Sequence, residues 1–172
     1  MGGKQDPVTR EAGFETRPIE SGDIAGVAQL WWRGWQDAHS RILPAELARL
    51  RTLASFEDRL CAAGQDARLV APSGSPMGFY LLKGDELNQF FVAEEARGTG
   101  LAAALIADAE EELSRRGIAL AWLACAIGND RAARFYQKAG WKLAGEVVIN
   151  MKTSEGGFDL KVWRYEKRLS GG

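Results

Sequence analysis

Residues 86–116 place an apolar extended run, a loop of small residues and a helical run in direct succession. ELNQFFV at 86–92 is typical of a strand, and ARGTGLAAALIADAEEEL at 96–113 starts with two glycines and continues with helical periodicity. A loop of small residues lets backbone N–H groups approach a ligand, and the helix start adds unsatisfied donors. This segment therefore predicts an anion site at Gly98 and Gly100. The alternative is a tight connection in which the glycines only supply unusual dihedral angles.

The rest of the chain predicts helices first and a sheet afterwards. In chain order, the expected elements are a short strand at 14–17, a helix from 24 to 35 capped by SGD at 21–23, helices at 44–53 and 56–63, strands at 68–71, 77–83 and 87–92, a helix at 99–116, a strand at 118–126, a helix capped by Asn129 or Asp130, and a closing hairpin that turns at Gly156 and Gly157. This order favours an α/β or α+β sandwich around a mixed sheet.

Length and charge limit the classes of protein that the chain can belong to. At 172 residues it suits one domain, which we expect at 14–169 with polar tails at 1–13 and 170–172. The 22 basic and 23 acidic residues are mixed along the chain and give a net charge of −1, so nucleic acid and anionic membranes are not expected partners. No apolar run approaches the roughly 20 residues of a membrane span, and the first residues lack a secretory signal. We expect a cytoplasmic protein.

The metal-ligating residues are few and scattered. Cys61 and Cys125 lie far apart in contexts without a motif, and His39 is the only histidine. No metal cluster can be assembled from them at familiar spacings. We expect no metal, and we interpret both cysteines as buried thiols.

The glycine loop also satisfies a dinucleotide-binding fingerprint, because Gly98, Gly100 and Ala103 have the GxGxxG/A spacing. The context does not fit. The preceding strand ends near Val92, five residues separate it from Gly98, the next strand carries no acidic residue at its end, and too little chain follows to complete the usual sheet. A nicotinamide oxidoreductase is therefore not favoured.

Two motifs together resemble the GNAT superfamily of acyl-CoA-dependent N-acyltransferases. The loop signature of that family is Arg or Gln, two residues, Gly, one residue, then Gly or Ala, and RGTGLA at 97–102 matches it. NDRAARFYQKAGW at 129–141 is similar to its second motif. The order of the elements also matches, over roughly 14–169. The resemblance implies a mixed, mostly antiparallel central sheet with helices on both faces.

The resemblance implies acetyl-CoA as the acyl donor. Its pyrophosphate would lie on the loop that contains Arg97, Gly98, Thr99, Gly100, Leu101 and Ala102. Its pantetheine arm would pair with the exposed backbone of Phe90, Phe91 and Val92, which uses main-chain groups and demands no particular side chain. Asn129 is either a helix cap or a cofactor contact. Arg131 and Arg134 either reach the nucleotide phosphates or form a solvated helix face.

Amide formation requires a base for the amine and an acid for the thiolate. The family places a tyrosine where this chain has Tyr136, which is the candidate acid; packing beside Phe135 is the alternative. Glu86 is the first candidate base, because it begins its strand near the place where many relatives have a carboxylate that activates the amine through water. The alternative is that Glu86 is an ordinary solvent-facing residue at a turn. His39 is the second candidate base because a histidine has a suitable unperturbed pKa, although a histidine beside tryptophans often only packs.

We therefore predict an N-acetyltransferase that moves an acetyl group from acetyl-CoA to a primary amine by direct transfer. A non-catalytic acyl-CoA-binding or regulatory module on the same fold is the alternative. The acceptor, a small-molecule or peptide amine, is not identified by the sequence. Trp31, Trp32 and Trp35 cannot all share one helix face, so at least one is expected in an acceptor cleft or at a homodimer contact. Gly34, in the middle of that helix, indicates a close approach.

Overall fold

The computed structural model describes residues 14–170, so the expected tail at 1–13, and all but the first residue of the expected tail at 170–172, lie outside the described residues. The helices are α1 (Ile24–His39), α2 (Ala45–Leu50), α3 (Leu53–Ala63), α4 (Leu101–Arg115) and α5 (Asp130–Lys138). The strands are β1 (Thr16–Pro18), β2 (Ala67–Val70), β3 (Gly78–Lys83), β4 (Glu86–Val92), β5 (Leu120–Ala126), β6 (Lys142–Thr153) and β7 (Gly156–Arg168). Single 3-10 turns lie at Ser21–Asp23, Gly64–Asp66 and Glu94–Ala96.

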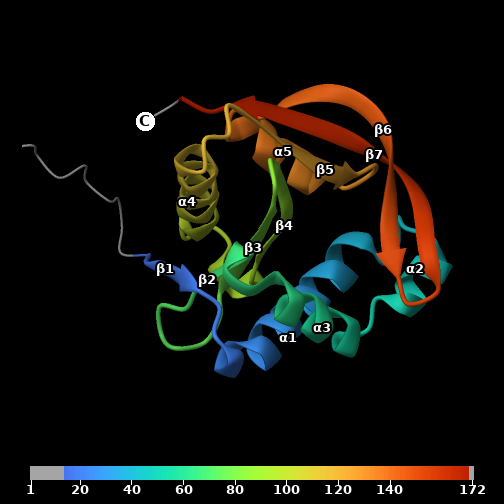
Figure 1. Cartoon of the computed structure of the whole chain (residues 1–172), viewed down its shortest axis with the longest axis horizontal. Coiled ribbons are helices and arrows are strands. Elements are labelled where there is room, and N and C mark those ends of the chain that lie inside the picture. The colour runs from blue at the N-terminus through green and yellow to red at the C-terminus, as the bar shows by residue number, and fades with distance from the viewer. Residues whose placement is uncertain (1–13, 171–172) are drawn as a thin grey trace, which may run out of the picture.

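The strands form one sheet in the order β1-β2-β3-β4-β5-β7-β6. Every neighbouring pair is antiparallel except β4 and β5, which are parallel. The parallel pair follows from the chain's path, because β4 leads into α4 and the chain crosses back before β5 begins. Helices lie on both sides of the sheet, with α4 on one side of β3 and β4 and with α1 and α3 on the other (Figure 1). The predicted mixed, mostly antiparallel sheet with helices on both faces is confirmed.

Alternation along β3 divides the core into two clusters. Tyr80 and Leu82 face α4 and α5, whereas Phe79 and Leu81 face α1 and α3. Successive strand side chains point to opposite faces, so a strand buried on both sides needs a continuous apolar run such as GFYLL. The helix that follows the glycine loop, α4, thus covers one face of the sheet, and the helix that contains the three tryptophans, α1, covers the other.

Local signals set most of the helix ends. The side chain of Asn129 accepts from the backbone N–H of Ala132 at 3.3 Å and caps α5, which decides between the two caps expected for this helix. Thr52 caps α3 in the same way, and Gly64 ends that helix at a φ of +55°. Helix α4 starts at Leu101, two residues later than predicted, because Gly98 and Gly100 both have positive φ.

The closing hairpin is longer than predicted, and its turn lies elsewhere. Thr153 pairs with Gly156, so the turn is at residues 154–155 and the two glycines belong to β7. The hydroxyl of Thr153 accepts from the N–H of Glu155 and donates to the carbonyl of Gly156, which stabilises this tighter turn. The long hairpin curves from the sheet down to α2 (Figure 1), where Glu155 and Arg49 form an ion pair at 2.9 Å.

The structure also bears on three features considered in the sequence: membrane spans, metal ligands and the two cysteines. None of the helices in residues 14–170 is long and apolar enough to cross a membrane. Within the same residues, no group of three or more His, Cys, Asp or Glu side chains converges as a metal site would require. The interpretation of both cysteines as buried is right for Cys125 and wrong for Cys61, which lies on the exposed face of α3.

Candidate active site

The two central strands separate soon after they meet. Glu86 and Trp122 are the register pair that joins β4 to β5 in the described chain, and a backbone hydrogen bond of 3.2 Å from Trp122 N–H to the Asp85 carbonyl lies beside it. Beyond this point, Phe90 to Val92 pair with β3 on one side only. The backbone of these residues is therefore free on the β5 side, where an extended ligand can add its own hydrogen bonds.

The glycine loop lies between the end of β4 and the start of α4. Gly98 has a φ of +76° and Gly100 a φ of +85°, and a Cβ atom on either would meet no other atom within 4 Å. The N–H groups of Gly98, Gly100, Ala102 and Ala103 find no acceptor in residues 14–170. Such unsatisfied donors at a helix start, where the helix dipole is positive, suit an anion.

Two of the predicted phosphate-binding arginines meet on one carboxylate. Arg97 and Arg131 donate to the same Oδ2 of Asp37, at 2.8 and 2.9 Å. These bonds, from Arg131 first and Arg97 second, hold the pKa of Asp37 below its ordinary value. Arg134 is exposed on α5 and forms no ion pair within the described chain. The structure thus brings Arg97 and Arg131 together beside the glycine loop.

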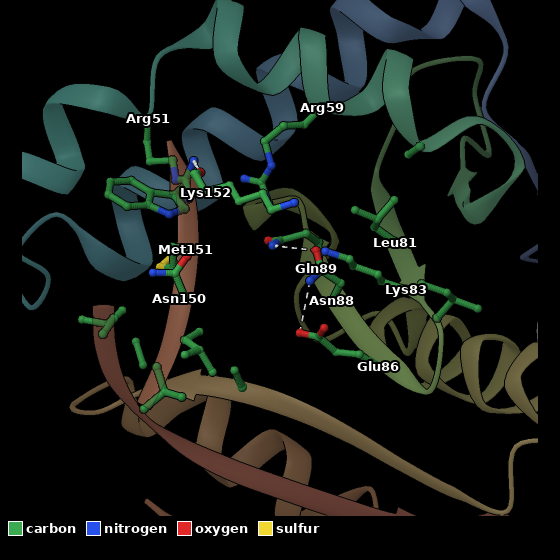
Figure 2. A pocket seen from close by; sticks show the side chains of 18 of the residues that line it. Arg51, Arg59, Leu81, Lys83, Glu86, Asn88, Gln89, Asn150, Met151 and Lys152 are labelled. Atoms are coloured by element: carbon green, nitrogen blue, oxygen red, sulfur yellow. Dashed lines mark hydrogen bonds between the residues drawn. The ribbon is translucent and has the colours of Figure 1, made fainter. Parts of the chain in front are cut away.

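A cavity of about 660 Å3 lies on the side of the sheet that carries α1 and α3, next to the place where β4 and β5 separate. Its walls are α1, α3, the strands β3, β4 and β5, and the curved hairpin of β6 and β7 (Figure 2). Trp122, Ala124 and Ala126 line it because alternate residues of β5 point to this face. A volume of this size suits a small molecule.

Glu86 lies on the wall of this cavity that β4 provides. A register shift between Leu81 and Leu82 on β3 lets Glu86, Asn88 and Gln89 all face the cavity. Asn88 Nδ2 donates to Glu86 Oε1 at 3.1 Å, and Gln89 Nε2 donates to Asn88 Oδ1 at 3.2 Å (Figure 2). Burial raises the pKa of Glu86 above its ordinary value, although the Asn88 bond acts in the opposite direction. A carboxyl group with a raised pKa is a better proton acceptor.

His39, the second candidate base, ends α1 and also lines the cavity. Its ring lies against Trp35 at 5.4 Å and Phe91 at 6.3 Å between centroids, and its Nδ1 has no hydrogen-bond partner within the described chain. Burial lowers the pKa of His39 to about 4. Its imidazole is therefore neutral at physiological pH and only weakly basic.

Tyr136 lies on the opposite face of the sheet from the cavity, in the cluster beneath α4 and α5. Its ring is surrounded by Phe90, Phe135, Trp141 and Tyr165, with centroids between 5.5 and 6.4 Å away. Its hydroxyl makes no hydrogen bond within the described residues, and burial raises its pKa above the ordinary value. The phenol therefore keeps its proton at neutral pH. Tyr136 packs beside Phe135, and its hydroxyl group is also available to donate a proton. The structure is therefore compatible with a packing role and with the role of the acid.

The tryptophans of α1 take different positions. Trp31 is fully buried and stacks on Phe56 with centroids 4.5 Å apart, whereas Trp35 lines the cavity. Gly34 faces Phe91, because a Cβ atom at position 34 would lie 2.5 Å from the Phe91 ring. The predicted close approach is thus made by a side chain of β4.

Several cavity residues were missed by sequence reasoning. Arg51 follows α2 and Arg59 lies on α3, and both enter the cavity. Asn88 reaches Glu86, and Gln89 reaches Asn88, through an irregularity in the strand pairing that has no clear sequence signal. Arg59 had one signal, since it follows Phe56 by three residues and so lies near the apolar face of its helix.

Comparison with known proteins points to one family. The model of the acetyltransferase (GNAT) family matches residues 24–141, which is more than half of the chain and contains both motifs. No match was found among curated proteins. The resemblance recognised from the two motifs is thereby confirmed.

Solved structures similar to the chain include three N-acetyltransferases. A GCN5-related N-acetyltransferase from Rhodopseudomonas palustris superimposes with a TM-score of 0.71 at 20% identity, over 92% of this chain and 97% of that chain. The PaiA N-acetyltransferase from Thermoplasma acidophilum, solved with coenzyme A, gives 0.66 at 16% identity, over 91% and 99%. The ribosomal-protein-S18-alanine N-acetyltransferase from Escherichia coli gives 0.64 at 20% identity, over 93% and 96%. At these low sequence identities, the three structures show that the chain shares their fold and nothing more specific.

Proposed function

Because the chain belongs to the acetyltransferase (GNAT) family, we propose that it transfers an acetyl group from acetyl-CoA to a primary amine by direct attack in a ternary complex. The observation that carries this proposal is the opening between β4 and β5. The loop with unsatisfied amides lies where β4 ends, Glu86 lies on one face, and Tyr136 lies on the other. A thioester in this opening would have a base and an acid on its two sides.

The donor would be held mostly by backbone groups. The free N–H groups of Gly98, Gly100, Ala102 and Ala103 suit the pyrophosphate, and Arg97 and Arg131 lie close enough to Asp37, and so to each other, to contact the same ligand. The pantetheine amides would pair with the free side of Phe90 to Val92, which directs the thioester toward the point where the strands meet. Coenzyme A in the Thermoplasma acidophilum structure is consistent with such a donor.

The amine would enter from the cavity and lose a proton to Glu86, through a bridging water, before it attacks the thioester carbonyl. The C–N bond forms, the C–S bond breaks, and the thiolate takes a proton from Tyr136, while the second proton that the nitrogen loses as the amide forms returns through water to Tyr136. Neither cysteine supports a covalent acyl-enzyme. Cys61 is exposed on α3 and does not line the cavity, whereas Cys125 is buried beside Ala126 and Asn129, and burial raises the pKa of its thiol to about 12. Direct transfer is therefore favoured over a two-step route.

Titration calorimetry with acetyl-CoA, free CoA and NAD tests the donor, and a screen of amines with acetyl-CoA, followed by thiol release, tests transfer. We expect micromolar or tighter binding of acetyl-CoA and CoA, no binding of NAD, and amine-dependent thiol release. Donor binding without transfer to any amine would replace the enzyme with an acyl-CoA-binding module. Absence of CoA binding would remove the basis for every assigned role.

A further inference from the structure

Two arginines enter the cavity, and neither forms an ion pair with a carboxylate of residues 14–170. Arg51 is 4% exposed; its Nη1 donates to the carbonyl of Lys152 at 3.2 Å, and its Nε has no partner in residues 14–170. Arg59 lies over the ring of Trp31, 4.4 Å from the centroid. Burial lowers the pKa of both groups, and repulsion from Arg51 helps to lower that of Arg59 to about 10. Among the described residues, no carboxylate acts to raise the pKa of either arginine.

This arrangement is unfavourable for the empty protein. An unpaired buried charge costs several kcal/mol of desolvation, and two neighbouring guanidinium groups also repel each other. Stacking on Trp31 and the bond to Lys152 fix the positions of Arg59 and Arg51, but neither contact supplies a negative charge. A bound anion would supply it, and guanidinium groups suit a planar carboxylate because their donors match its two oxygens.

The other charged groups that line the cavity leave the two arginines available for a bound carboxylate. Lys83 and Lys152 also line it, and its carboxylates are those of Asp66 and Glu86. Asp66 is already paired with Arg116 at 2.8 Å. Glu86 lies on the β4 wall, whereas Arg59 reaches into the cavity from α3 on the facing wall (Figure 2). The unpaired arginines and Glu86 therefore lie on different walls of the cavity, and Lys83, the register partner of Glu86 on β3, is the cation at the Glu86 wall.

From this arrangement, and resting on the proposed function, we propose that the acceptor is a small amino acid-like molecule that carries a carboxylate together with its primary amine. The carboxylate pairs with Arg51 and Arg59, and this pairing points the amine across the cavity at Glu86. The transfer itself is unchanged: the amine nitrogen gains the acetyl group, and CoA leaves as its thiol. Amines without an anionic group leave the two arginines unpaired and are poorer substrates.

The test compares amino acids with their own carboxamides, which have nearly the same size but lack the negative charge. Thiol release gives kcat/KM for each pair, and a series with increasing separation of amine and carboxylate (glycine, β-alanine, 4-aminobutyrate, 6-aminohexanoate and lysine) measures the span of the cavity. We expect the best acid to exceed its amide by about ten-fold or more. Arg59→Gln is expected to reduce this ratio to near one, chiefly by raising KM of the acid, and Arg59→Lys to restore part of it.

Arg49→Gln is the matched control, because Arg49 is an exposed arginine of the neighbouring helix paired with Glu155 outside the cavity. It is expected to keep the wild-type preference. Equal rates for acids and amides, or a preference that survives Arg59→Gln, would overturn the proposal. Calorimetry with the same amino acids separates the two levels of inference: charge-dependent binding without thiol release supports the anion site but refutes the transferase, and transfer without charge preference does the opposite.

Discussion

Arg97 donates to Asp37 across 2.8 Å, so the last turns of α1 are bonded to the residue that precedes the glycine loop. Arg131, from α5, donates to the same oxygen. Three elements that are distant in the sequence thus meet at one exposed carboxylate. A phosphate arriving at the loop would compete with Asp37 for these two arginines.

Replacing Asp37 with asparagine is expected to tighten acetyl-CoA binding. The two arginines lose a partner that holds them away from the ligand. Exposed ion pairs of this kind are worth about 0 to 1 kcal/mol, which corresponds to a Kd lower by up to about five-fold. Calorimetry measures the change. Glu155→Gln breaks the exposed pair with Arg49 and serves as the control with unchanged affinity. Weaker binding by Asp37→Asn would mean that the carboxylate positions the arginines instead of competing for them.

Gly100→Ala is expected to weaken acetyl-CoA binding about ten-fold or more, because the added methyl group would occupy open space at the loop to which the pyrophosphate is assigned. Positive φ also strains alanine, at a cost of about 1 kcal/mol in the free energy of unfolding. Gly117→Ala is a matched control, since Gly117 has a similar φ of +81° and equally open surroundings. Both variants should lose stability, and only the first should lose affinity. Equal affinities would make the loop glycines purely conformational.

Tyr136→Phe is expected to lower kcat about 100-fold or more while the Kd for acetyl-CoA stays within about two-fold of wild type. The free energy of unfolding should hardly change, because the hydroxyl makes no hydrogen bond within residues 14–170. Tyr165→Phe is the control, since the Tyr165 hydroxyl lies 3.4 Å from Gln137 Nε2 in the same cluster. Steady-state kinetics measures kcat, and denaturant unfolding measures the free energy of unfolding. Unchanged turnover in Tyr136→Phe would exclude Tyr136 as the acid.

The pH dependence of kcat/KM is expected to show an acid limb that belongs to Glu86. Activity falls as pH decreases through the pKa of this carboxyl group, because the protonated form accepts no proton, and burial holds that pKa above the ordinary value. Glu86→Gln should lower kcat/KM by about 100-fold or more and abolish the limb. Asp85→Asn, at the exposed neighbour that accepts from Trp122 Nε1, should keep it. A limb that persists in Glu86→Gln would point to another base.

His39 is expected to make the protein less stable in acid. The folded state holds the pKa of His39 near 4, whereas the unfolded chain has the ordinary 6.5. Between these values the unfolded state binds the additional proton, so stability is lost as pH falls from 6.5 toward 4, by about 2 kcal/mol between pH 7.5 and pH 5. Denaturant unfolding at both pH values measures this, and His39→Gln should show a correspondingly smaller loss. An identical loss in that variant would assign the acid sensitivity to other groups.

Much of the local structure could be predicted because its causes lie close together in the chain. Asn129 caps α5 through a residue three positions away, and Gly64 ends α3 through its own backbone angle. The turn of the hairpin was misplaced because Gly156 and Gly157 suggested a turn, whereas the hydroxyl of Thr153 stabilises one two residues earlier. Competing turn signals at such short separation are resolved by strand register, which depends on the whole sheet.

By itself the sequence determined the fold class and the family, since hydrophobic periodicity, glycine positions and two short motifs are local properties of the chain. Only the tertiary structure decided what meets in the cavity. Arg51 bonds to the carbonyl of Lys152, 101 residues away, and Arg59 faces a cavity whose opposite wall holds Glu86. Such meetings depend on how far the hairpin curves and how two strands separate, and these follow from packing between distant elements, which no short stretch of residues encodes.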